Sequence, residues 1–184
     1  MKTRRHLTEE ECEALFRKYE TPPHVIRHCR AVSRTAGKLA DALNASGACF
    51  DAELVRSAGL IHDVMRLQEP HGPNAADMLE SIGFPEEADI VRVHMIHLFP
   101  PLAEAKEVDL VCLADRLVKE DRYVGLDERV EYLIHKKGES PERTARLLEG
   151  KKMTRLFMDE IEKAIGQDLD ILLAEDDPEK DAVR

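Results

Sequence analysis

Apolar residues repeat at helical spacing along most of this chain. Between His24 and Leu43 they recur every three or four positions, and the same spacing returns between Ala52 and about Arg66. Each of these segments is predicted to be a helix. An alternation of apolar and polar residues, which is typical of a half-buried strand, does not extend over any useful length. The pattern therefore predicts an all-α protein.

A shorter helix is predicted before these two. Thr8 and Glu11 have the spacing of a capping box, which begins a helix that runs to about Tyr19. Further along, residues 44–50 lack helical periodicity and are predicted to form a loop. Asp51 follows this loop and can cap the helix that comes next.

Proline and glycine divide the second half of the chain into further helices. The helix with the most apolar residues in this half is expected to lie at the centre of the core. Gly150 could interrupt the last long helix, and the acidic chain from Asp168 onward is expected to fray. The predicted helices are a segment through Ala75–Ile82, a helix from Pro85 through Leu98, the apolar helix from about Lys106 to Lys119, Asp127–Lys136, and Ser140 to about Ile165.

The composition limits the functions that this chain can have. Hydrophobic residues make up 43% of the sequence and aromatic residues only 4%, so aliphatic side chains must fill the core. The net charge of -10 repels phosphate backbones and anionic lipid, which argues against a nucleic acid or a membrane as partner. No apolar run approaches the length of a signal peptide core or a membrane span. We therefore expect a cytoplasmic protein.

The four cysteines do not form a CxxC pair, and most lie inside predicted helices. An ordinary apolar core needs no disulfide, so we expect reduced and mostly buried thiols. They are Cys12, Cys29, Cys49 and Cys112.

Three polar elements interrupt apolar helical segments and need a physical reason. His28 lies on the second helix, His62-Asp63 lies near the end of the third, and Asp115 lies in the middle of the most apolar helix. A buried carboxylate is costly unless it is paired or binds a metal. If Asp115 lies near His28 and His62, the three side chains would form a mixed nitrogen and oxygen metal site.

These elements resemble the H…HD…D signature of the HD superfamily, and the resemblance covers roughly Pro23 to Arg122. It implies an all-α, HD-domain helical bundle with a core over about residues 23–122. The N-terminal helix and a C-terminal helical extension would pack around this core within a single domain, residues 1–184. The resemblance also implies a metal-dependent phosphohydrolase.

Two further histidines extend the resemblance to a subgroup with six ligands, which includes symmetrical diadenosine tetraphosphate hydrolases. His71 opens HGPNAADML and His94 closes the segment IVRVH, and both look like elements of that subgroup. The resemblance implies that His28, His62 and Asp115 hold one metal, that His71 and His94 hold a second, and that Asp63 bridges the two. Mixed histidine and carboxylate ligation suits iron or manganese, whereas magnesium, cobalt, nickel and zinc are also compatible.

The implied reaction is hydrolysis of a phosphate ester or anhydride in a small nucleotide-like molecule, with metal-bound hydroxide as the nucleophile. Asp63 and Arg66 are the candidate catalytic residues, and Arg66 is the first candidate to clamp the substrate phosphate. Arg116 and Arg122 are weaker candidates for substrate binding, because both follow the last aspartate in a basic segment. His97 would lie one helical turn beyond His94, where it could contact substrate or replace His94 as a ligand.

Other interpretations remain open from the sequence. Some HD proteins use a similar site as diiron oxygenases, and others are noncatalytic modules that bind a nucleotide as a signal. His62-Asp63 could be a hydrogen-bonded pair at a helix end, His71 a loop residue, and Arg66 a solvated charge. The last long helix could pack against the rest of the domain or form a homodimer surface.

Overall fold

The computed structural model describes residues 5–94, 97–136 and 140–174. Almost all regular structure in these residues is helical, so the all-α prediction is confirmed. A two-stranded hairpin is the only sheet in the described ranges. The elements are α1 (Glu9–Lys18), α2 (Pro23–Ala45), α3 (Ala52–Ile61), α4 (His71–Ser81), α5 (Pro85–Val93), the 3-10 helix η1 (Leu102–Glu104), α6 (Glu107–Leu117), β1 (Val118–Lys119), β2 (Arg122–Tyr123), α7 (Gly125–Lys136), α8 (Pro141–Ile165) and α9 (Leu169–Leu173).

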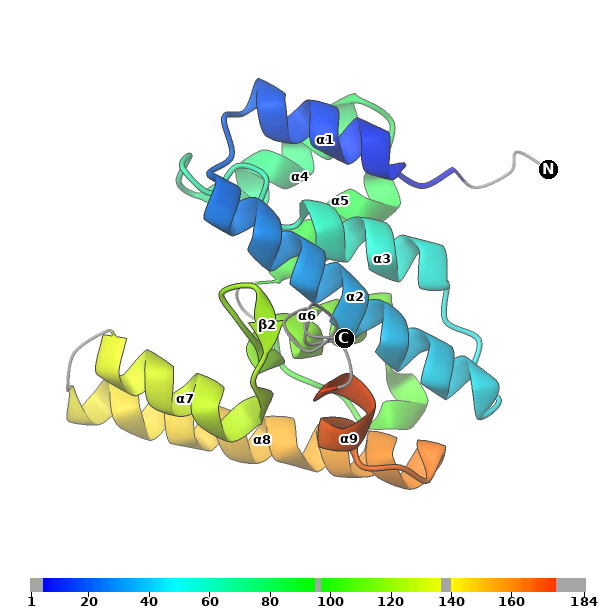
Figure 1. The fold of residues 1–184 in the computed structure, drawn as a ribbon, viewed down its shortest axis with the longest axis vertical. Helices are drawn as coiled ribbons and strands as arrows, with labels where there is room; N and C mark the ends of the chain where they lie inside the picture. The colour runs from blue at the N-terminus through cyan, green and yellow to red at the C-terminus, as the bar shows by residue number, and fades with distance from the viewer. Residues whose placement is uncertain (1–4, 95–96, 137–139, 175–184) are drawn as a thin grey trace, which may run out of the picture.

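The long helix α2 organises the bundle, as Figure 1 shows. It contacts α3, α6, α8 and α9, and so it reaches both ends of the molecule. Helices α1, α4 and α5 lie on one side of α2 in this view, and α7 packs along α8 on the opposite side. The C-terminal helices therefore form a layer of their own below the rest of the bundle.

Buried side chains form two hydrophobic clusters. The α6–α8 core combines α6 with parts of α2, α3, α8 and α9, and it includes Leu39, Leu113 and Met158. The α4–α5 core combines α1, α4 and α5 with the start of α2 and the end of α3, and it includes Phe16 and Leu79. Each of these five side chains is less than 2% exposed.

Three helix ends differ from the prediction. Helix α3 ends at Ile61 instead of Arg66, because the chain turns there and the Val64 carbonyl accepts a hydrogen bond from the Thr21 hydroxyl at 2.6 Å. Helix α4 begins already at His71, since a proline two residues later is tolerated in the first turn. Helix α5 ends at Val93, which leaves Leu98 outside it and 85% exposed. Met95, expected on this helix, lies outside the described residues.

The C-terminal third also differs from the prediction in two places. Helix α6 ends at Leu117, and the next residues form the hairpin instead of a further helical turn. Residues from Asp168 onward were expected to fray, yet Asp168 caps α9, and Leu169 and Leu173 are buried in the α6–α8 core. Gly150 does not interrupt α8. Gly138, which follows the helix predicted for Asp127–Lys136, lies outside the described residues.

All four cysteines are free, and three of them are buried. Burial raises the pKa of the Cys12 and Cys112 thiols to about 12, and it also raises the pKa of Cys29 well above its usual value. Only Cys49 is exposed. The expectation of reduced, mostly buried thiols agrees with this arrangement.

One thiol should therefore react in the folded protein. Because the thiolate is the nucleophile, Ellman's reagent at pH 8 is expected to modify Cys49 within minutes and the other three cysteines only after unfolding in guanidinium. A Cys49→Ser variant should show no fast phase, and two or more fast thiols in the wild type would contradict this burial pattern.

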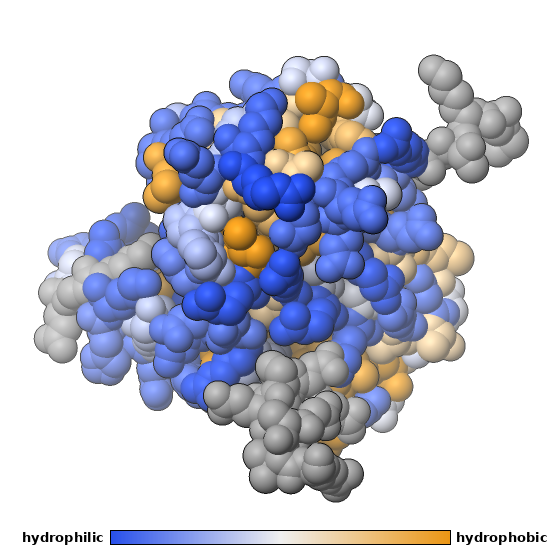
Figure 2. All heavy atoms as spheres, turned by 45° about the horizontal axis from the view of Figure 1, so that its top comes forward, coloured by the Kyte–Doolittle hydropathy of each residue, from blue (hydrophilic) through white to orange (hydrophobic). Residues whose placement is uncertain are grey.

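The face of the molecule in Figure 2 is mostly hydrophilic, with hydrophobic residues in small separate areas. None of the described helices combines the length and apolar character that a membrane span requires.

Candidate metal centre

The six residues predicted as metal ligands come from different elements and lie together. They are placed where α2, α3 and α6 meet the starts or ends of α4 and α5. His28 lies on α2, His62 and Asp63 follow α3, His71 opens α4, His94 follows α5, and Asp115 lies on α6.

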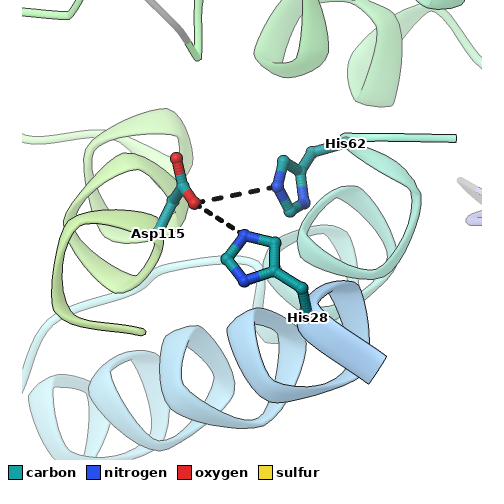
Figure 3. A group of neighbouring side chains, drawn as sticks. All are labelled: His28, His62 and Asp115. Carbon is teal, nitrogen blue, oxygen red and sulfur yellow. Dashed lines mark hydrogen bonds and ion pairs between the residues drawn. The ribbon is translucent and has the colours of Figure 1, made fainter. Parts of the chain in front are cut away.

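One group consists of His28, His62 and Asp115, and Figure 3 shows their side chains pointing toward one another. Oδ1 of Asp115 lies 2.9 Å from Nε2 of His28 and 3.9 Å from Nε2 of His62. His62 is almost fully buried, and the other two are partly buried. This group has the size and donor set of a three-ligand metal site.

Asp63 connects this group to a second one. Its Oδ2 lies 3.8 Å from Nε2 of His62, whereas its Oδ1 lies 3.2 Å from Nε2 of His71 and 3.5 Å from Nε2 of His94. The two oxygens of one carboxylate thus face two sets of histidines. This is the arrangement that a bridging carboxylate requires.

All four histidines are held in the same way. Each ring has Nδ1 next to an oxygen acceptor, which favours a proton on Nδ1 and directs Nε2 toward the centre. The acceptors are the Glu120 carbonyl for His28 at 2.9 Å, the Gly59 carbonyl for His62 at 2.8 Å, the Val91 carbonyl for His94 at 2.6 Å, and the Glu69 carboxylate for His71 at 3.3 Å. Metal-binding histidines in proteins show this orientation.

Two of these orientations follow from the local sequence. His62 and His94 each occupy the position just after the last residue of a helix, α3 and α5. The last carbonyls of a helix have no partner within it, so a histidine there can bond the carbonyl three residues earlier. The end of each helix thereby aims an imidazole at the centre.

Buried polar atoms at this centre have no hydrogen-bond partner. Among the described residues, only four buried side-chain atoms lack one, and three of them are Nε2 of His62, Oδ1 of Asp63 and Nε2 of His94. An unsatisfied buried polar atom costs about 1–3 kcal/mol. A cluster of lone pairs directed at one another is stabilised by a cation, so the residues present fit a divalent metal.

The electrostatics keep both carboxylates ionised. Burial alone would raise the pKa of Asp63, but the nearby His62, His71, His94 and Arg66 outweigh it and hold that pKa well below its usual range. Burial of Asp115 is likewise outweighed by His28 and His62, so its pKa is also lowered.

The pKa values of the histidines diverge. Burial lowers the pKa of His62, which favours its neutral form, the form that binds metal. Burial is outweighed at His28 by Asp115 and at His94 by Asp63, so the pKa values of both are raised.

A pocket of about 980 Å³ opens beside this centre. Asp63, His94 and Asp115 line its base, and seven Lys or Arg side chains line it together with three further carboxylates. The wall is therefore basic in a chain whose net charge is -10. The size suits a small-molecule ligand, and the charge suits an anion.

Arg66 is the cation closest to the second group of ligands. Its Nη1 donates a hydrogen bond to Nε2 of His71 at 3.0 Å and lies 3.8 Å from Oδ1 of Asp63. The guanidinium also lines the pocket. The structure thus places this predicted phosphate clamp where it can reach a group bound at the centre.

Arg116 lies in the pocket, but its donors are engaged. It donates to the Thr154 hydroxyl at 3.1 Å and to the His97 carbonyl, and it lies 4.6 Å from the centroid of the Phe99 ring. Burial lowers its pKa. These contacts join α6, α8 and the segment after α5, so Arg116 holds the rim of the pocket together.

The structure corrects the expected places of His97 and Arg122. His97 does not continue α5, because the helix ends at Val93, and its Nε2 bonds the buried carboxylate of Asp109 although its ring lines the pocket. Arg122 lies on β2, 3.9 Å from Glu128, and lines a different and smaller pocket. The hairpin directs it away from the centre.

Several residues at the centre or in the pocket were not predicted from the sequence. Glu69 orients His71, and Arg129 and Tyr132 on α7 line the wall. Glu69 had one local signal, since it stands two residues before His71. The residues on α7 had none, because only the packing of the C-terminal helices brings them to the pocket.

Comparison with known proteins agrees with this geometry. An uncharacterized protein of Methanocaldococcus jannaschii is 34% identical over a match that covers 57% of this chain and 72% of that protein. No solved structure matches the chain. The HD domain family matches residues 25–120, more than half of the chain and the part that contains all six candidate ligands. The chain therefore belongs to the HD domain family, a superfamily of metal-dependent phosphohydrolases whose domains bind divalent metals.

Proposed function

We propose that this protein hydrolyses a phosphate ester or anhydride of a small nucleotide-like molecule. The observation that carries the proposal is the convergence of four imidazole Nε2 atoms and two carboxylates at the base of a basic pocket. A phosphorylated substrate would place its reacting group at this base and its remaining parts along the wall.

We propose two metal ions, as in the six-ligand subgroup. The first would be held by His28, His62 and Asp115, and the second by His71 and His94, with Asp63 between them. When bound, such a metal pair lowers the pKa of water and offsets negative charge on phosphoryl oxygens. The mixed imidazole and carboxylate donors favour iron or manganese over a structural zinc.

The chain's own residues would position the substrate. Arg66 lies beside Asp63 and His71, so it can donate to a phosphoryl oxygen that displaces its present bond to His71. Apolar residues of the wall, including Leu126 and Leu133, and the ring of Tyr132 can contact a nucleobase. The four free cysteines suit a reducing compartment, and we propose a cytoplasmic location.

Metal content and turnover test this proposal together. The protein would be purified without oxygen, its metals quantified, and phosphate release measured on a panel of nucleotides with iron, manganese or magnesium. About two metal equivalents and turnover on a member of the panel are the expected result.

Three other outcomes would contradict parts of the proposal. One equivalent with turnover would remove His71 and His94 from the ligand set. Iron with oxygen consumption and no phosphate release would identify an oxygenase. Nucleotide binding without any turnover would identify a sensing module.

A further inference from the structure

Arg129 on α7 is the one arginine of the pocket for which the described residues supply no polar partner. Its Nε is the fourth of the buried side-chain atoms that lack a hydrogen bond, beside the three of the metal centre. Within the described part of the chain, its guanidinium makes no ion pair; its one contact is with the Tyr132 ring, whose centroid lies 5.8 Å from Cζ. Arg129 is half-buried, and a buried N–H such as its Nε is costly to leave without an acceptor, so a ligand that accepts from it would stabilise the site.

Most other cations of the pocket wall already have polar partners. Arg27 pairs with Asp121 at 3.3 Å, and Lys151 pairs with Asp127 at 2.8 Å. Arg146 donates to the Glu142 carbonyl at 3.4 Å. These contacts leave Arg129 as the arginine whose charge and donors are available to an anion.

The surroundings of Arg129 add positive charge. Lys119 and Lys136 lie 4.8 and 5.1 Å from the centroid of the Tyr132 ring, the same ring that Arg129 approaches. Helix α7 lies outside residues 25–120, the part of the chain that matches the HD domain family. The C-terminal extension therefore contributes Arg129 and Lys136 to the pocket, whereas Lys119 lies within the matched part and pairs with Glu128 at 3.1 Å.

We propose that Arg129 binds a second phosphate group of the substrate, while the first reacts at the metal centre. The inference rests on the proposed function and narrows the substrate to a molecule that carries two separated phosphate groups. Asp63, His94 and Arg129 line one pocket, and its volume of about 980 Å³ leaves room for a spacer between the two groups. The planar fork of arginine suits bidentate binding of phosphate.

Pyrophosphate binding to the metal-free protein tests this inference without any turnover. After chelation, the carboxylates of Asp63 and Asp115 repel anions from the base of the pocket, so Arg129 becomes the main anion site. Calorimetry is expected to show that Arg129→Gln weakens pyrophosphate binding about tenfold, whereas Arg129→Lys loses less because it keeps the charge. Arg34→Gln is the matched control, since Arg34 is an exposed arginine of α2 outside the pocket, and it should bind as the wild type does.

The outcomes separate this inference from the proposed function. Wild-type affinity in Arg129→Gln would overturn the inference, whatever the enzyme assay shows. If Arg129→Gln does not fold, undiminished affinity in a folded Arg129→Met variant, which also lacks the charge, would overturn it equally. If no nucleotide is hydrolysed but Arg129→Gln still binds pyrophosphate more weakly than the wild type, the proposed function is wrong and the anion site at Arg129 is supported.

Discussion

Asp63→Asn is expected to remove both metal ions and to lower turnover by at least about a thousandfold. The amide keeps the shape of the side chain but lacks the charge with which the carboxylate faces His62 on one side and His71 and His94 on the other. Metal analysis of the purified variant and its rate of phosphate release would measure the two effects.

Two variants make this result specific. His71→Gln should lose one metal equivalent and keep the other, because in the proposed two-metal centre His71 would hold the second metal alone. Asp77→Asn makes the same chemical change at a side chain that is 71% exposed and should match the wild type. If Asp63→Asn retains two metals, Asp63 is not the bridging ligand.

Glu87→Ala should destabilise the protein by about 3 kcal/mol, which lowers Tm by about 10 °C in a chain of this length. The carboxylate is 1% exposed. It accepts hydrogen bonds from the Leu7 amide at 3.1 Å and the Ser57 hydroxyl at 2.9 Å, and it lies 3.2 Å from Nδ1 of His6. Truncation leaves the Leu7 amide without its acceptor, whereas the Ser57 hydroxyl keeps its second acceptor, the Leu54 carbonyl at 3.1 Å. Tm should be measured by thermal unfolding in the presence of a chelator, so that differences in bound metal do not contribute to it.

Asp89→Ala on the same helix is the control, because Asp89 is exposed and should change stability by no more than about 0.5 kcal/mol. Glu87→Gln keeps an acceptor oxygen, so its loss of stability should be smaller than that of Glu87→Ala and larger than that of Asp89→Ala. Equal Tm values for Glu87→Ala and the wild type would show that the N-terminal segment does not depend on this carboxylate.

The sequence could predict the ligands because their chemistry conflicts with their surroundings. Asp115 lies in an apolar helix, and His62-Asp63 follows a run of aliphatic residues. Burying such polar side chains is costly unless they have partners, and this conflict can be recognised from the sequence alone. Their spacing along the chain then supplied the family resemblance, and the structure brings all six candidates together. Their role as ligands remains a prediction for metal analysis.

Other features depend on contacts that the local sequence does not encode. The end of α3 is fixed in part by Thr21, 43 residues before the carbonyl that it bonds. His6 is another case, because its side chain is only 6% exposed between Asp51 and Glu87, which lie 45 and 81 residues further along the chain. Helix α9 had a readable signal in the four-residue spacing of Leu169 and Leu173, which the acidic composition around them obscured.

The division of the interior into two cores has an evolutionary consequence. The helices that add Arg129 and the rest of the C-terminal wall pack on the α6–α8 core, whereas the elements that carry His71 and His94 pack on the α4–α5 core. Changes that reshape α7 and α8 therefore leave the packing behind these two histidines intact. Relatives can diverge in the molecules they accept while the chemistry at the base of the pocket stays the same.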